Sequence, residues 1–236
     1  MNMIKYCHPR MSKTSPWRWY LSGIQCISLI ILSGCSPFIP QSLSKLDISI
    51  HQVIYVTPIK KSVHQAMLSA WQRQGQGWQR RFIVRAVIGR NGLASPDQKK
   101  EGDGKTPSGV FLLGPAFGYA SSITTGLQYR QATQNDFWVD DVHSLQYNQW
   151  VVGLPVAKSF ERMRRFDYLY SYGIVIGYNM HPIIPGAGSA IFMHVWRGVN
   201  SSTSGCVALN QRQLKRILRW LKQEYQPVII LEKTDA

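Results

Sequence analysis

The chain has 236 residues, and its 27 Lys and Arg against 12 Asp and Glu give a formal net charge of +15 at pH 7. This length excludes two large domains, and 44% hydrophobic with 17% charged residues excludes a wholly disordered chain. A basic surface favours polyanions such as nucleic acid, anionic lipid headgroups or an acidic cell wall. Because the sequence has no zinc-finger spacing, no helix of clustered arginines and no aromatic RNA-binding motif, nucleic acid is not an expected partner.

The first 34 residues are typical of an export signal. Basic residues are followed by a mostly apolar run over residues 20–32 and then by small residues. At about 13 residues, the run is short for a transmembrane helix and fits a signal-peptide core. Leu32-Ser33-Gly34-Cys35 resembles the bacterial lipobox, so Cys35 is the expected lipidation site. An uncleaved anchor with an incidental cysteine is the alternative, and Met11 is an alternative start.

The residues after Cys35 predict where the protein resides. Ser36 at this position is typical of lipoproteins that are sorted to the outer membrane. We therefore expect the protein in the cell envelope, on the periplasmic side and held by its lipid. Residues 36–46 are rich in Ser and Pro and predict a tether between the lipid and the folded domain.

The cysteine count singles out one thiol. The four cysteines are Cys7, Cys26, Cys35 and Cys206. If the leader is removed and Cys35 carries lipid, Cys206 is the only free thiol and has no partner for an internal disulfide. Such a leftover cysteine in an exported protein indicates a reactive thiol, whereas a small buried hydrophobic residue is the alternative.

Short β-branched and aromatic runs predict strands along the exported chain. They cover residues 51–56, 82–88, 110–113, 172–178, 190–196 and 228–231. Residues 62–72 have helix-like apolar spacing and predict a short helix. Residues 121–150 are predicted to be irregular, with apolar islands at 137–139 and 150–152.

The clearest helix follows Asn210, which is a suitable N-cap. Apolar residues recur at i, i+3, i+4 and i+7 from Leu214 to Leu221, and Pro227 marks the end of the helical region. Many short strands with one or two helices predict a mixed α+β domain dominated by strands. A phosphate loop is excluded, because Gly104-Lys105-Thr106-Pro107 lacks the preceding glycine and Pro107 blocks the helix that should follow.

Candidate catalytic residues gather in residues 190–210. His194 lies in a predicted strand, 12 residues before Cys206. Cysteine catalysis needs a thiolate, and an imidazole within reach can take the proton and hold the ion pair. Gly205 lets the backbone bend, so that amide groups can point at a developing oxyanion. His194 as a core residue and His181 as a rival base remain alternatives, and no histidine has metal-ligand spacing.

The segment from His194 through Thr203, Gly205 and Cys206 resembles the signature of the L,D-transpeptidase (YkuD-type) catalytic domain, in which a histidine precedes a Ser/Thr-x-Gly-Cys element. The loops at 88–92 and 101–111 are also similar to that family, and the resemblance covers most of residues 80–230. Two departures bear on the substrate. Ser204 stands where many members have a second histidine, and Val207 and Ala208 stand where many have an arginine.

The resemblance implies a β-sandwich or barrel-like YkuD domain with a C-terminal helix. The implied organisation is a signal peptide over 1–34, a lipidated cysteine and tether over 35–46, and a catalytic domain over 47–236. In the implied mechanism, Cys206 attacks the carbonyl before the D-alanine of a peptidoglycan stem peptide. His194 is the base, and the backbone amides of Ser204 and Gly205 hold the oxyanion. No metal or organic cofactor is implied.

Four side chains are predicted to contact the substrate, with an arginine pairing with a stem carboxylate. They are Tyr178, Trp196, Arg197 and Thr203. The implied activity is a peptidoglycan L,D-transpeptidase with stem peptides as partners. An L,D-carboxypeptidase or amidase that hydrolyses stems or wall-protein links is one alternative, and a non-catalytic wall-binding lipoprotein is another. The sequence leaves the acyl acceptor and the oligomeric state open.

Overall fold

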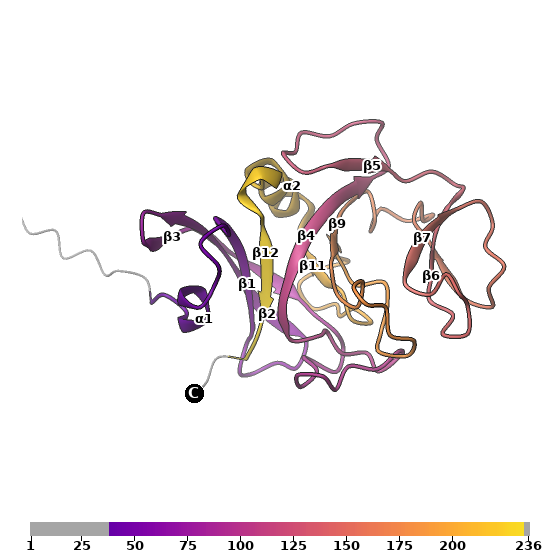
Figure 1. Cartoon of the computed structure of the whole chain (residues 1–236), viewed down its shortest axis with the longest axis horizontal. Coiled ribbons are helices and arrows are strands. Elements are labelled where there is room, and N and C mark those ends of the chain that lie inside the picture. Colours follow the sequence, from indigo (N-terminus) through magenta and orange to yellow (C-terminus); the bar gives the residue numbers. More distant parts are fainter. Residues whose placement is uncertain (1–37, 234–236) are drawn as a thin grey trace, which may run out of the picture. The chain divides into compact units, whose positions relative to one another are not determined.

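The computed structural model describes residues 38–233 (Figure 1). The predicted signal peptide, the lipobox and Cys35 lie outside these residues. Within the described part, no helix has both the length and the apolar character that crossing a membrane requires.

Residues 38–233 form a nine-stranded sheet that closes on itself. Its order is β12-β1-β2-β3-β11-β10-β9-β4-β5, and β12 also pairs with β4, so that eight strands form a barrel and β5 extends from it. The strands are β1 (Gln52–Pro58), β2 (Gln65–Gln74), β3 (Gly77–Val87), β4 (Gly109–Gly118), β5 (Tyr129–Gln131), β9 (Tyr172–Ile176), β10 (Phe192–Val195), β11 (Val207–Leu209) and β12 (Val228–Leu231). The six strands predicted from the sequence correspond to β1, β3, β4, β9, β10 and β12, and the β-dominated fold class is confirmed.

Alternate side chains of the barrel strands build the main core. Met193 and Val195 of β10 meet Val207 and Leu209 of β11 there. The predicted C-terminal helix is confirmed as α2 (Gln211–Trp220; Figure 1). Its buried Leu and Ile side chains pack on this core. Its N-cap is Asn210, as predicted. The helix ends before Pro227, and a 3-10 turn, η1 (Gln223–Tyr225), lies between them.

The helix predicted over residues 62–72 is wrong, because this segment contains the start of β2. Ala66, Leu68 and Ala70 alternate into the barrel core. Trp71 points to the opposite face and is also buried, in a second cluster. A strand that is covered on both faces lacks a clear apolar–polar alternation, and here its spacing imitates a helix.

A one-turn helix, α1 (Gln41–Ser44), lies against the outer face of β1 and β2 (Figure 1). Its Leu43 is fully buried and packs with Val53 and Trp71. The predicted tether over 35–46 therefore overlaps a segment that is packed on the barrel.

A separate small sheet covers another part of the barrel. It consists of β7 (Gln149–Val152), β6 (Asp136–Val139) and β8 (Phe160–Arg162), in that order. The two predicted apolar islands are β6 and β7. Trp138 of β6 packs edge-on against Phe192 of β10, with ring centroids 4.9 Å apart. The small sheet therefore lies over the outer face of β10, beside the barrel in Figure 1.

Candidate active site

Two neighbouring parallel strands position Cys206 and His194. Met193 of β10 is paired with Val207 of β11, and His194 with Ala208. Cys206, which immediately precedes β11, therefore lies beside Phe192. Since side chains alternate along a strand, His194 and Cys206 project from the same outer face as diagonal neighbours.

The loop before Cys206 requires its glycine. Gly205 has a φ of +156°, and a Cβ there would lie 3.1 Å from both the Lys105 carbonyl oxygen and Ile191 Cδ1. Thr203 fixes the same loop, because its hydroxyl donates to the Cys206 carbonyl at 2.6 Å. Thr106 donates to the same carbonyl at 3.4 Å. The Gly-Lys-Thr-Pro loop therefore supports the backbone of the candidate nucleophile.

A pocket of about 240 Å³ opens over this pair. It brings together most of the residues predicted from the sequence. These are His194, Trp196, Arg197, Thr203, Ser204 and Cys206. Tyr178 does not line the pocket, because its hydroxyl donates to the Ala187 carbonyl and its ring packs edge-on against Phe111. The structure thus gives no support to Tyr178 as a substrate contact.

The Cys206 sulfur is enclosed by backbone groups. Its Sγ accepts from the Phe192 amide and donates to the Ala190 carbonyl, each at 3.3 Å. Burial raises the pKa of the thiol to about 12, the charge of Glu161 adds to this, and the Phe192 amide opposes it. At that pKa, the thiol is almost entirely protonated at pH 7.

The His194 ring is buried and held in one tautomer. Its Nδ1 lies 2.8 Å from the Val195 carbonyl oxygen. A carbonyl only accepts, so Nδ1 is assigned the proton and Nε2 keeps its lone pair. Burial lowers the pKa of His194 to about 4, against the opposing contact with Val195. The imidazole is therefore neutral at pH 7.

These two pKa shifts favour a neutral thiol and a neutral imidazole over the ion pair expected from the sequence. Both side chains are neutral in the resting site, and no hydrogen bond joins Cys206 Sγ to the His194 ring. Catalytic hydrogen bonds often tighten only when substrate binds. Proton transfer from Cys206 to His194 would therefore accompany the attack on substrate.

The predicted oxyanion amides differ in availability. The Gly205 amide donates to the Thr203 hydroxyl at 3.2 Å and is already engaged. An oxyanion hole in this loop would therefore depend on the amides of Ser204 and Cys206. Ser204 also accepts from Arg90 Nη1 at 3.2 Å through its hydroxyl.

Several pocket residues were not identified from the sequence. They are Arg90, Glu161, Arg165, Leu169 and Tyr170. The last four come from β8 and the loop after it, far from Cys206 in the chain. Arg165 makes two hydrogen bonds to Asp167, at 3.0 and 3.1 Å, and Arg197 lies 3.6 Å from the same carboxylate. The Tyr170 ring contacts the His194 ring edge-on, with centroids 5.1 Å apart.

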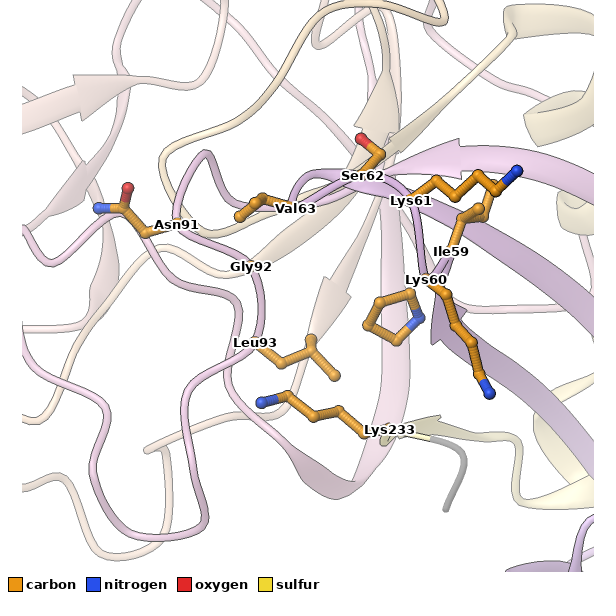
Figure 2. Close-up of a pocket in the computed structure, with 10 residues that line it drawn as sticks. Ile59, Lys60, Lys61, Ser62, Val63, Asn91, Gly92, Leu93 and Lys233 are labelled. Carbon is orange, nitrogen blue, oxygen red and sulfur yellow. The ribbon is translucent and has the colours of Figure 1, made fainter. Parts of the chain in front are cut away.

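A larger cavity of about 510 Å³ lies elsewhere and contains neither cysteine nor histidine (Figure 2). Lys60, Lys61 and Lys233 line it, together with apolar side chains. Asn91 and Gly92 border this larger cavity, and the preceding residue, Arg90, lines the Cys206 pocket. The loop of residues 90–92 therefore borders both cavities. The rival base, His181, lines neither. Among residues 38–233, no group of His, Cys, Asp and Glu is arranged to hold a metal ion.

Comparisons with known proteins place the chain in a family. The sequence profile of the L,D-transpeptidase catalytic domain, YkuD, matches residues 59–230. Among solved structures, Bd1075 from Bdellovibrio bacteriovorus is similar, with 16% identity, a TM-score of 0.43, and coverage of 78% of this chain and 48% of that one. The helical cell shape determining protein Pgp2 from Campylobacter jejuni has 16% identity, a TM-score of 0.42, and coverage of 79% and 49%.

The chain thus spans about half the length of these two solved proteins. A comparison with curated proteins gave no match. The profile match covers most of the chain and includes both His194 and Cys206. The protein belongs to the YkuD family of L,D-transpeptidase catalytic domains.

Proposed function

We propose that the protein is a peptidoglycan L,D-transpeptidase that works through a thioacyl-enzyme on Cys206. The observation that carries this proposal is the shared pocket. A buried thiol and a neutral imidazole project from the same face of adjacent strands and line one cavity. Family membership supplies the substrate class, which is the stem peptide of peptidoglycan.

In the acylation step, Cys206 Sγ attacks the carbonyl between the third stem residue and D-alanine. His194 Nε2 takes the thiol proton as the C–S bond forms and gives it to the departing amine of D-alanine. The amides of Ser204 and Cys206 hold the oxyanion. The products of this half-reaction are free D-alanine and a thioester on Cys206.

The cationic rim of the pocket suits a peptide that carries carboxylates. Arg90 and Arg197 are exposed and line the pocket, so their guanidinium groups can pair with stem carboxylates. Arg165 is held by Asp167 and contributes charge at a fixed position. Trp196 offers an apolar wall for the stem.

The decisive experiment combines the full chain in detergent with purified fragments bearing tetrapeptide stems. A Cys206→Ala variant runs beside it. Intact-protein mass spectrometry should detect the thioester only in the wild type, and D-alanine should be released only there. A crosslinked product indicates transfer, and a shortened monomer indicates the hydrolase alternative. If neither protein alters the fragments, the enzymatic proposal fails.

We also propose that the protein is lipid-anchored through Cys35 on the periplasmic side of the outer membrane. The lipobox-like sequence supports this proposal. Cells given labelled fatty acid should label the wild type but not a Cys35→Ala variant. Equal labelling of the two proteins would overturn it.

A further inference from the structure

The Cys206 pocket contains one carboxylate among its basic side chains. Of the described residues that line it, Arg90, Arg165 and Arg197 are cationic, and only Glu161 is acidic. Glu161 lies on β8, where it is paired with Trp138 of β6. Paired residues project from the same face of a sheet, and Trp138 packs on Phe192. The Glu161 side chain is therefore directed at the barrel and the nucleophile.

A hydrogen bond fixes the carboxylate near the base. The Tyr170 hydroxyl donates to Glu161 Oε2. The ring of Tyr170 in turn packs against His194 and Phe192, at centroid distances of 5.1 and 5.7 Å. Within residues 38–233, no ion pair reaches Glu161. Its charge is therefore available to a cation that enters the pocket.

The proton balance of transfer calls for a second base. A side-chain amine of a stem peptide resembles that of lysine and is an ammonium at neutral pH. Its reaction with the thioester gives an amide, the Cys206 thiol and one additional proton. His194 is neutral after acylation and can accept one proton, which it passes to Sγ. Hydrolysis requires only this one transfer, because water supplies a single proton to the sulfur.

We propose that Glu161 binds the ammonium of the acyl acceptor and takes its first proton, so that transfer to an amine depends on Glu161 and hydrolysis does not. This inference rests on the proposed function. Glu161 takes one proton, and the neutral nitrogen attacks the thioester carbonyl. His194 takes the second proton from nitrogen and gives it to Sγ as the C–S bond breaks. Glu161 then releases its proton to solvent.

The surroundings of Glu161 favour a proton-accepting role. Burial raises the pKa of Glu161. The Tyr170 hydrogen bond opposes this shift, the charges of Asp140 and Glu101 add to it, and Arg165 opposes it. Cys206 and His194 also line the same pocket. A carboxylate of raised pKa takes a proton from an ammonium more readily than an ordinary one does.

The test is Glu161→Gln in the full chain, because the amide oxygen can still accept from Tyr170. The donor is a tetrapeptide stem and the acceptor a tripeptide stem with a free diamino side chain. We expect the ratio of transfer to hydrolysis to fall at least about 100-fold at neutral pH, because both reactions start from the same thioester and only transfer uses Glu161. Hydroxylamine, which is uncharged at this pH, should restore transfer. Glu224→Gln, on an exposed turn, is the matched control and should behave as wild type.

Three results would overturn the inference. One is unchanged transfer in Glu161→Gln, and another is an equal loss of transfer, hydrolysis and acylation. The third is a wild type that acylates but transfers to no amine, which would leave the thioester chemistry of Cys206 intact. A wild type that never acylates would overturn the proposed function, and this inference with it.

Discussion

The two faces of the β10–β11 pair differ in what their side chains do. The inner face carries Met193, Val195, Val207 and Leu209, each at most 2% exposed and packed in the barrel core. The outer face carries His194 and, just before β11, Cys206, both in the pocket. Because side chains alternate with a period of two, the same two short strands provide core residues on one face and candidate catalytic residues on the other. Substitutions on the two faces should therefore have separable effects.

The largest expected effect is on the outer face. His194→Gln removes the base, so acyl-enzyme formation should slow roughly 100- to 10,000-fold. The midpoint of thermal unfolding at pH 7 should change little, because glutamine can still donate to the Val195 carbonyl. Release of D-alanine and calorimetry measure the two quantities. A full rate in this variant would remove His194 from the mechanism and end the distinction between the faces.

The inner face should give the opposite result. Met193→Ala leaves a cavity in the barrel core and should lower the free energy of unfolding by about 2–5 kcal/mol. The rate of D-alanine release per folded molecule should remain close to wild type. Met193→Leu conserves volume and should cost less than about 1.5 kcal/mol. Denaturant titration measures both, and a large loss of activity in a folded Met193→Leu protein would show that the faces are coupled.

The pH dependence of folding stability should show that His194, on the outer face, is buried as a neutral imidazole. The pKa of His194 is about 4 in the folded protein, whereas the ordinary value is 6.5. Proton binding at this site does not affect stability above pH 6.5, but stability is lost as the pH falls towards and through 4, since the unfolded chain binds the proton first. The total loss is about 3 kcal/mol. His194→Gln should lack this part of the pH dependence. Parallel stability curves for the two proteins would show that the histidine is not buried as neutral imidazole.

The smallest expected change in stability comes from a substitution at the junction between β11 and α2. Asn210 follows β11, and its side chain accepts from the Arg212 amide at 2.9 Å. Asn210→Ala should cost about 1 kcal/mol of unfolding free energy and leave activity unchanged, whereas Asn210→Asp retains the cap. Equilibrium unfolding and D-alanine release check these expectations. An activity loss in Asn210→Ala would connect helix packing to the outer face.

Local sequence patterns predicted those helices and strands that bury one face and expose the other, because their apolar residues recur with a clear period. The helix after Asn210 has one apolar stripe, and several strands are bounded by glycine or asparagine turns. β2 was misread because Trp71 is buried on one face and Leu68 on the other, which removes the alternation. Closure of the barrel depends on pairings such as Val53 with Val228, and no local pattern encodes those.

The candidate site was predictable only where its residues are close in the chain. His194 and Cys206 lie within one short segment, and strand pairing brings their side chains onto one face. Glu161 and Tyr170 reach the pocket from β8 and the following loop, and only the packing of the small sheet on Phe192 brings them there. Tyr178 was predicted as a substrate contact, but its ring packs edge-on against Phe111 and it does not line the pocket.

The position of β12 at the end of the sequence determines when the barrel can close during synthesis. β12 pairs with both β1 and β4, and it follows every other described strand in the sequence. A ribosome releases β1 long before β12, so the ring of strands cannot form until synthesis has passed Leu231. Pairings between such distant segments also slow folding. A nascent chain of this protein therefore cannot close its barrel while it is still being made.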